Sequence, residues 1–88
     1  RDPAFWATHG GAEIDLLMQI DTRRVGVEVK RTDQPAVTPS MRIALEDLGL
    51  DHLYVAHAGR HRFRLAERIT AVPAIELVTD PTVFERGS

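Results

Sequence analysis

The chain has 88 residues, of which 43% are hydrophobic and 27% charged, and its formal net charge at pH 7 is -2. This size and composition predict one small globular domain and exclude a disordered polar chain. The near-neutral charge gives no overall attraction to nucleic acid or to an anionic membrane, so any such binding requires a local basic patch. The absence of cysteine excludes a disulfide scaffold or a zinc ribbon, and we expect a cytoplasmic protein. No apolar run approaches the roughly 20 residues of a membrane span, so we expect no membrane partner.

Structure is expected almost from the first residue, because residues 5–8 are strand-like and contain the only tryptophan. A turn at residues 9–11, which include two glycines, should follow. This abrupt start predicts that the chain is a C-terminal piece of a longer protein. We expect a single domain at residues 1–80 and a short tail at residues 81–88.

Two runs of alternating residues predict an antiparallel hairpin, with residues 14–20 and 25–30 as its strands. The polar residues 21–23 form a short link between the runs. Leu17 is the one apolar residue outside the alternation. The apolar positions are Ile14, Leu16, Met18, Ile20, Val25, Val27 and Val29.

The register of this hairpin determines whether three charged residues meet. Opposed residues in a hairpin point to the same face of the sheet. If the apolar sets share one face, the numbers of opposed residues sum to 43 or 45, and Asp15, Glu28 and Lys30 then share the other face. A one-residue slip would oppose apolar and charged residues along the whole ladder. The sequence therefore predicts that Asp15, Glu28 and Lys30 converge.

A loop, a helix and a second buried strand follow the hairpin. Residues 31–37 show no periodicity and contain a proline, which predicts a loop. A Thr-Pro start and apolar residues at helical spacing predict the main helix at residues 38–48, with Gly49 as its left-handed cap. Residues 52–56 form a buried strand, which should run parallel to the second hairpin strand because a helix lies between them. The expected fold is α/β, a mixed sheet with an antiparallel hairpin and a β-α-β unit.

The last part of the chain carries three regularly spaced arginines. Residues 60–65 are predicted as an alternating strand that lines Arg60, Arg62 and Arg64 along one face. These side chains would suit contacts with nucleic-acid phosphates, and the alternative is an edge strand protected by charge against aggregation. Residues 71–78 should form a short edge strand or one helical turn that closes the sheet.

The three converging charges suit a divalent cation. Asp15 and Glu28 supply the oxygen ligands that Mg²⁺ prefers, and the backbone carbonyl of Val29 is a third candidate. Lys30 beside a metal-bound water would position or help deprotonate it and stabilise a phosphoryl transition state. This arrangement suits phosphodiester hydrolysis. The alternative is an ordinary ion pair between Glu28 and Lys30 on a solvated strand face.

A second candidate metal pair is formed by His57 and His61, whose spacing is compatible with shared binding. Gly59 lies between them and argues against a helix that would bring them together.

The segment His-Gly-Gly-Ala-Glu-Ile-Asp-Leu-Leu at residues 9–17, followed by Val-Glu-Val-Lys at residues 27–30, carries a family resemblance. It resembles the C-terminal domain of unknown function that follows an AAA+ type ATPase in many bacterial and archaeal proteins. That domain is similar to PD-(D/E)xK nucleases and Holliday-junction resolvases, so the resemblance implies a restriction-endonuclease-like core. It implies that Asp15 and Glu28 are magnesium ligands and that Lys30 is the catalytic lysine of a nuclease acting on DNA.

The sequence also departs from that superfamily. The additional carboxylate that often comes from an upstream helix has no counterpart in these 88 residues, and no phosphate-binding loop motif occurs. ATP would therefore bind only through an N-terminal module outside this chain. Two other functions remain open: an inactive module that docks on or regulates its ATPase, and a domain that forms homodimers.

Overall fold

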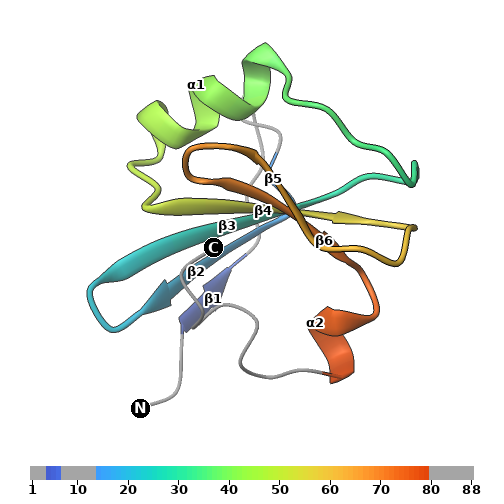
Figure 1. The fold of residues 1–88 in the computed structure, drawn as a ribbon. Helices are drawn as coiled ribbons and strands as arrows, with labels where there is room; N and C mark the ends of the chain where they lie inside the picture. Colours follow the sequence, from blue (N-terminus) through green and yellow to red (C-terminus); the bar gives the residue numbers. More distant parts are fainter. Residues whose placement is uncertain (1–3, 7–13, 80–88) are drawn as a thin grey trace.

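The computed structural model describes residues 4–6 and 14–79, which form a compact α/β domain around a mixed six-stranded sheet (Figure 1). The strand order is β1-β2-β3-β4-β6-β5. Strands β3, β4 and β6 are parallel, whereas β1–β2, β2–β3 and β5–β6 are antiparallel pairs. In chain order the elements are β1 (Ala4–Trp6), β2 (Leu16–Ile20), β3 (Arg23–Val29), α1 (Pro39–Asp47), β4 (His52–His57), β5 (Phe63–Ala66), β6 (Ile69–Pro73) and α2 (Glu76–Thr79).

The predicted α/β class, the hairpin and the parallel pairing of β3 with β4 are confirmed. The expected turn at residues 9–11 and the expected tail at residues 81–88 lie outside the described residues. Within the described part of the chain, no helix has the length and apolar character needed to cross a membrane.

The hairpin has the predicted register, because its opposed residues sum to 43. Leu16 lies opposite Val27, and Ile20 lies opposite Arg23. The turn consists of Asp21 and Thr22 alone, since Arg23 already belongs to β3. Asp21 has a φ of 55°, in the left-handed region that aspartate tolerates better than most residues.

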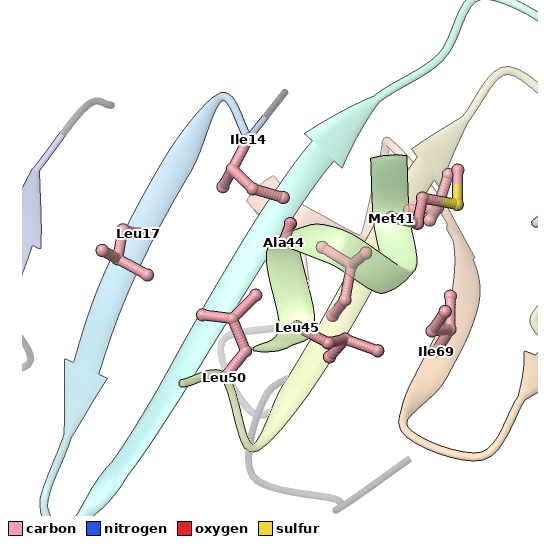
Figure 2. Close-up of a cluster of buried hydrophobic side chains, with 9 residues drawn as sticks. Ile14, Leu17, Met41, Ala44, Leu45, Leu50 and Ile69 are labelled. Carbon is pink, nitrogen blue, oxygen red and sulfur yellow. The ribbon is translucent and has the colours of Figure 1, made fainter. Parts of the chain in front are cut away.

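Both faces of the sheet are buried, which corrects the expectation of one apolar and one polar face in the hairpin. Helix α1 covers one face, called here the α1 face (Figures 1 and 2). Its buried cluster consists of Ile14, Leu17, Met41, Ala44, Leu45, Leu50, Leu53, Val55 and Ile69. The other face, called here the opposite face, buries Met18, Val25, Val27, Tyr54, Ala56 and Val72, and Leu77 of α2 packs against them.

Two hairpin residues therefore lie on a face that the alternation did not predict. Leu17 belongs to the α1 face because that face has its own core, so it is not an exception to the pattern. Ile14 was grouped by its even spacing with Met18, but it also lies on the α1 face (Figure 2). The chain bends at Asp15 and β2 begins only at Leu16, so strand alternation does not extend to Ile14.

Gly26 sets the distance between β3 and the segment that follows α1. A Cβ atom at Gly26 would lie 2.8 Å from Leu50 Cδ1 and 3.4 Å from both Ile14 Cγ2 and Leu53 Cδ1. The α1 face can therefore pack this closely only because residue 26 has no side chain.

Helix α1 begins and ends at the residues that the sequence predicts. Thr38 is the N-cap, and its hydroxyl accepts a hydrogen bond from the Met41 N–H at 3.3 Å. Gly49 has a φ of 60°, and the Leu50 N–H donates to the Leu45 carbonyl at 3.0 Å. This pairing is a Schellman motif, and it folds Leu50 back into the core as expected.

The last strands differ from their predictions. β6 is a buried interior strand between β4 and β5, so the expectation of an edge strand at residues 71–78 is wrong, although the short helix α2 follows it. Pro73 is compatible with this position because it is the last residue of β6 and lies beyond the last β5 pair, Phe63 with Ala71. No ladder hydrogen bond is lost there. The edge strand on this side of the sheet is β5, which begins at Phe63 and not at residue 60.

Candidate functional site

Glu28 and Lys30 form an ion pair at the carboxyl end of β3. The Glu28 Oε2 atom lies 2.8 Å from Lys30 Nζ. Glu28 is only 3% exposed, whereas the Lys30 side chain is 34% exposed. Glu28 lies opposite Val55 of the α1-face cluster, so its carboxylate is buried on the α1 face. The predicted solvated polar face does not exist at this position.

Asp15 is hydrogen-bonded to the backbone of β3 near the same end of the strand. Its Oδ2 atom accepts a hydrogen bond from the Val29 N–H at 2.7 Å, and its own N–H donates to the Val27 carbonyl at 3.0 Å. The side chain thus replaces the backbone acceptor that β2 would supply if it continued. The structure anchors Asp15 at the residue that separates Glu28 from Lys30, on an exposed part of the chain.

The backbone of Val29 faces Asp15. The Lys30 N–H donates to the Ala56 carbonyl of β4 at 2.8 Å. Neighbouring residues of a strand direct their backbone groups to opposite sides, so the Val29 carbonyl points away from β4 and toward the β2 side. It therefore lies on the side of the strand where Asp15 is anchored.

Whether these residues suit a cation depends on the buried carboxylate of Glu28. Within residues 14–79, the Glu28 Oε1 atom is buried and has no hydrogen-bond partner. Buried polar oxygens are normally paired, and a divalent cation is one partner that would satisfy such an atom. Glu28, Asp15 and the Val29 carbonyl thus suit a hard cation with oxygen ligands. In the described part of the chain, no group of three His, Cys, Asp or Glu side chains is placed to hold a metal ion.

The three predicted arginines do not lie along one strand, because β5 begins only at Phe63. Arg60 lines a pocket near the end of β4, before β5 begins. Arg62 and Arg64 lie close enough to His52 to affect its pKa, and Arg64 pairs with Thr70 across β5 and β6. The single basic strand face expected from the alternation therefore does not form, since only Arg64 belongs to β5.

His52 begins β4 on the opposite face, where it is affected by one hydrogen bond and by nearby arginine charges. Its Nε2 atom lies 2.7 Å from the Thr70 hydroxyl oxygen. Burial, and to a smaller extent the positive charges of four arginines, together lower the pKa of His52 to about 4. These are, from the largest effect, Arg23, Arg64, Arg62 and Arg68.

Sequence reasoning missed a pocket at the carboxyl end of β4. It has a volume of about 680 Å³ and is lined by residues 33–35, 57–61 and Phe63. Because Val29 lies opposite Ala56 in the parallel ladder, the next pair in the same register is Lys30 with His57. The signal available in the sequence was the end of a buried strand, since ligands often bind at the carboxyl ends of parallel strands.

His57 is buried at the end of β4, with 1% of its surface exposed. Its Nδ1 atom accepts a hydrogen bond from the Gly59 N–H at 2.9 Å. A neutral ring in this position carries its proton on Nε2 and has no lone pair left for a metal ion. This geometry disfavours the metal pair of His57 with His61.

Comparison with known proteins gives a family without an assigned activity. No solved structure matches the chain significantly. Two proteins described as uncharacterized, Mb2031c of Mycobacterium bovis and Rv2008c of Mycobacterium tuberculosis, are each 42% identical to it over 81 residues. The match covers 92% of this chain but only 18% of each relative, so the chain spans about a fifth of their length. The family described as Domain of unknown function (DUF4143) matches residues 1–77, and the chain belongs to this family.

Proposed function

We propose that this domain is a nuclease-like module with a restriction-endonuclease-like core, which supports magnesium-dependent hydrolysis of phosphodiesters in DNA. The observation that carries the proposal is the buried Glu28 carboxylate, which has one oxygen paired with Lys30 and the other without a hydrogen-bond partner in the described residues. A surface ion pair needs no burial, and a buried carboxylate with an unpaired oxygen is destabilising. Such an arrangement is more typical of a binding site than of a structural contact.

The topology supports the same proposal. The hairpin leads into a β-α-β unit, and the ion pair lies at the end of β3, which pairs in parallel with β4. In open α/β sheets, ligands bind outside the carboxyl ends of the strands. Asp15 is brought to this edge by the hairpin register and its bond to Val29.

The residues have distinct roles in this proposal. Glu28, Asp15 and the Val29 carbonyl would hold Mg²⁺, which supplies Lewis-acid stabilisation of phosphoryl charge when it is bound. Lys30 is the catalytic residue: it keeps a positive charge beside the reacting phosphate while its contact with Glu28 fixes its position. Arg60, in the adjacent pocket, would contact the phosphate backbone of the substrate.

Metal binding can be tested by calorimetry with Mg²⁺ and Mn²⁺ on the wild type and on Asp15→Asn. Asp47→Asn is the matched control, because Asp47 is an exposed aspartate at the end of α1. We expect binding heat in the wild type and in Asp47→Asn, and a clear loss in Asp15→Asn. Equal heats in the two variants would contradict the metal site. Metal-dependent DNA cleavage by the longer protein that contains this domain is the separate test of catalysis.

A second candidate function is a docking or regulatory module, and two exposed apolar residues favour it. Ile75 is 63% exposed and Val78 is 80% exposed, and they lie three residues apart at α2, on one side of a helical turn. In this alternative the partner is either an AAA+ type ATPase module of the same protein, which would bind the ATP, or a second copy of the domain. Such a protein would work in the cytoplasm.

The double variant Ile75→Ser/Val78→Ser separates the docking alternative from the nuclease. If α2 is a docking surface, this variant weakens association with the remainder of the longer protein, or dimerisation, in sedimentation at several concentrations. Ile43→Ser is the control, because Ile43 is 53% exposed on α1. An equal effect of both changes would contradict docking through α2.

A further inference from the structure

His57, one of the residues that line the pocket, has a buried donor without an acceptor among the described residues. The Nδ1 atom of His57 accepts from the Gly59 N–H, so the neutral ring carries its proton on Nε2. Within residues 14–79, this Nε2 atom is buried and has no hydrogen-bond partner. Buried donors without an acceptor are rare in folded proteins, and His57 is also one of the residues that line the pocket, so a ligand bound there is one candidate for the missing acceptor.

The charges around the pocket define what kind of acceptor it would be. Arg60 and His61 line it together with a single acidic residue, Asp33. Lys30 and His57 each directly follow the last pair of the β3–β4 ladder, Val29 with Ala56. Because a donor on His57 Nε2 cannot bind a cation, the group that fits is an anion with several oxygen acceptors, such as a phosphate.

The pocket also contains an aromatic surface. Phe63 is 37% exposed, and its ring centroid lies 5.5 Å from that of His57. Exposed aromatic rings stack on nucleobases without regard to their sequence. The volume of about 680 Å³ lies within the usual range for pockets that bind small molecules.

We propose that this pocket binds a nucleoside monophosphate unit, whose phosphate accepts a hydrogen bond from His57 Nε2 and pairs with Arg60 while its base stacks on Phe63. The unit is either the 5′-phosphorylated end of a nucleic acid strand or a free nucleotide. The strand-end source rests on the proposed function, because it places the substrate next to Lys30. Binding of the unit itself does not depend on a metal ion.

The test is calorimetric titration of the 88-residue chain in EDTA with four probes: AMP, adenosine, and a dinucleotide with and without a 5′-phosphate. We expect both phosphorylated probes to bind at least about tenfold more tightly than their unphosphorylated forms, the effect of one contact to a charged group. Tighter binding of the phosphorylated dinucleotide than of AMP indicates the strand-end source, and equal binding indicates a free nucleotide. Equal affinity for phosphorylated and unphosphorylated probes would overturn the proposal.

Matched variants locate the binding. Arg60→Gln should lower the affinity for the phosphorylated probes about tenfold, whereas Arg42→Gln, at an exposed arginine of α1, should leave it unchanged. His57→Phe should remove most of the preference for phosphate while keeping an aromatic ring. AMP should also shift the side-chain NMR signals of His57 in the wild type. Equal effects of the two arginine variants, or unshifted His57 signals, would overturn the proposal.

The outcome is independent of the metal site. Asp15→Asn should bind the phosphorylated probes as tightly as the wild type, because the titrations contain EDTA. Loss of metal heat with retained nucleotide binding would be assigned to the metal site alone. Retained metal heat without nucleotide binding would overturn the pocket and leave the proposed function standing.

Discussion

Two histidines begin and end strand β4, and their surroundings are opposite in kind. His52 at the amino end lies on the opposite face, bonded to Thr70 and surrounded by arginines that help to keep its ring neutral. His57 at the carboxyl end lies beside the pocket, and its Nε2 donor has no acceptor in the described residues. Both are buried, with 6% and 1% of their surfaces exposed. Burial alone therefore does not distinguish the two histidines, whereas the hydrogen bonding of their Nε2 atoms does.

The same contrast extends along the carboxyl edge of the sheet. The Glu28 Oε1 atom is a second buried polar group there without a hydrogen-bond partner in the described part of the chain. One unsatisfied group is an acceptor and the other a donor, and they belong to neighbouring parallel strands. An unsatisfied acceptor and an unsatisfied donor on neighbouring strands suit a ligand that brings both a cation and an anion, such as a metal-bound phosphate.

The largest expected effect comes from removing the charge that compensates Glu28. Lys30→Ala should lower the free energy of unfolding by about 2–4 kcal/mol, because it leaves a buried carboxylate without its ion pair. The partial exposure of Lys30 places this value below that of a fully buried pair. Urea unfolding in EDTA measures it.

The double variant Lys30→Ala/Glu28→Gln is the control, because a neutral amide needs no compensating charge. It should recover at least half of the loss, as expected when the damage comes from an uncompensated charge. A loss below about 0.5 kcal/mol in the single variant would mean that Glu28 is not buried in solution.

The two ends of β4 should respond differently when a polar group is removed. Thr70→Val deletes the partner of His52 and should lower the unfolding free energy by about 1–2 kcal/mol. His57→Phe deletes a donor that makes no bond and should lower it by less than about 1 kcal/mol, through the lost contact with Gly59. Thermal and urea unfolding at pH 7 measure the stability lost in each of the two variants. A larger loss at His57 would reverse the assignment of structural and functional roles.

The smallest expected effect is a pH dependence that belongs to the amino end. The unfolded chain protonates His52 near pH 6.5, whereas the folded protein keeps its ring neutral down to a pKa of about 4. The stability from this group is therefore full above pH 6.5 and is lost as the pH falls from about 6.5 to about 4. We expect this loss of unfolding free energy to be roughly 1–2 kcal/mol. It is less than the whole pKa shift implies, because the arginine charges are partly exposed and screened by salt.

Urea unfolding at pH 7 and pH 4.5 tests this on the wild type, on His52→Gln and on His61→Gln, an exposed histidine as control. His52→Gln should lose less stability between the two values than the other two proteins. The same pH dependence in all three would mean that the carboxylates, and not His52, cause it.

Local chemistry made part of this fold predictable from sequence. The N-cap hydroxyl of Thr38 and the left-handed Gly49 mark the ends of α1, because both depend on residues adjacent in the chain. The hairpin register was predictable because only one parity keeps the apolar residues of β2 and β3 together. The helix between β3 and β4 likewise required a parallel pair.

Features that depend on distant packing were not predictable in this way. Nothing in residues 14–20 reveals that α1 covers the second face, so Leu17 looked like an exception and Glu28 looked solvated. The interior place of β6 depends on its pairing with β4 and β5, which the presence of Pro73 obscured. The candidate site was predicted as Asp15, Glu28, Lys30 and the Val29 carbonyl, but the hydrogen bond that anchors Asp15 and the pocket at His57 follow from the assembled strand ends.

The two-residue turn at Asp21 and Thr22 helps to hold β2 and β3 in the register that the proposed metal site requires. A longer turn would give β2 room to slip along β3, and a slip of one residue would put Leu16 or Ile14 in place of Asp15 beside the Val29 N–H. An aliphatic side chain there cannot accept that hydrogen bond or carry a charge. We therefore expect relatives that keep the site to conserve the length of this turn, and to differ in length at the loop of residues 31–37.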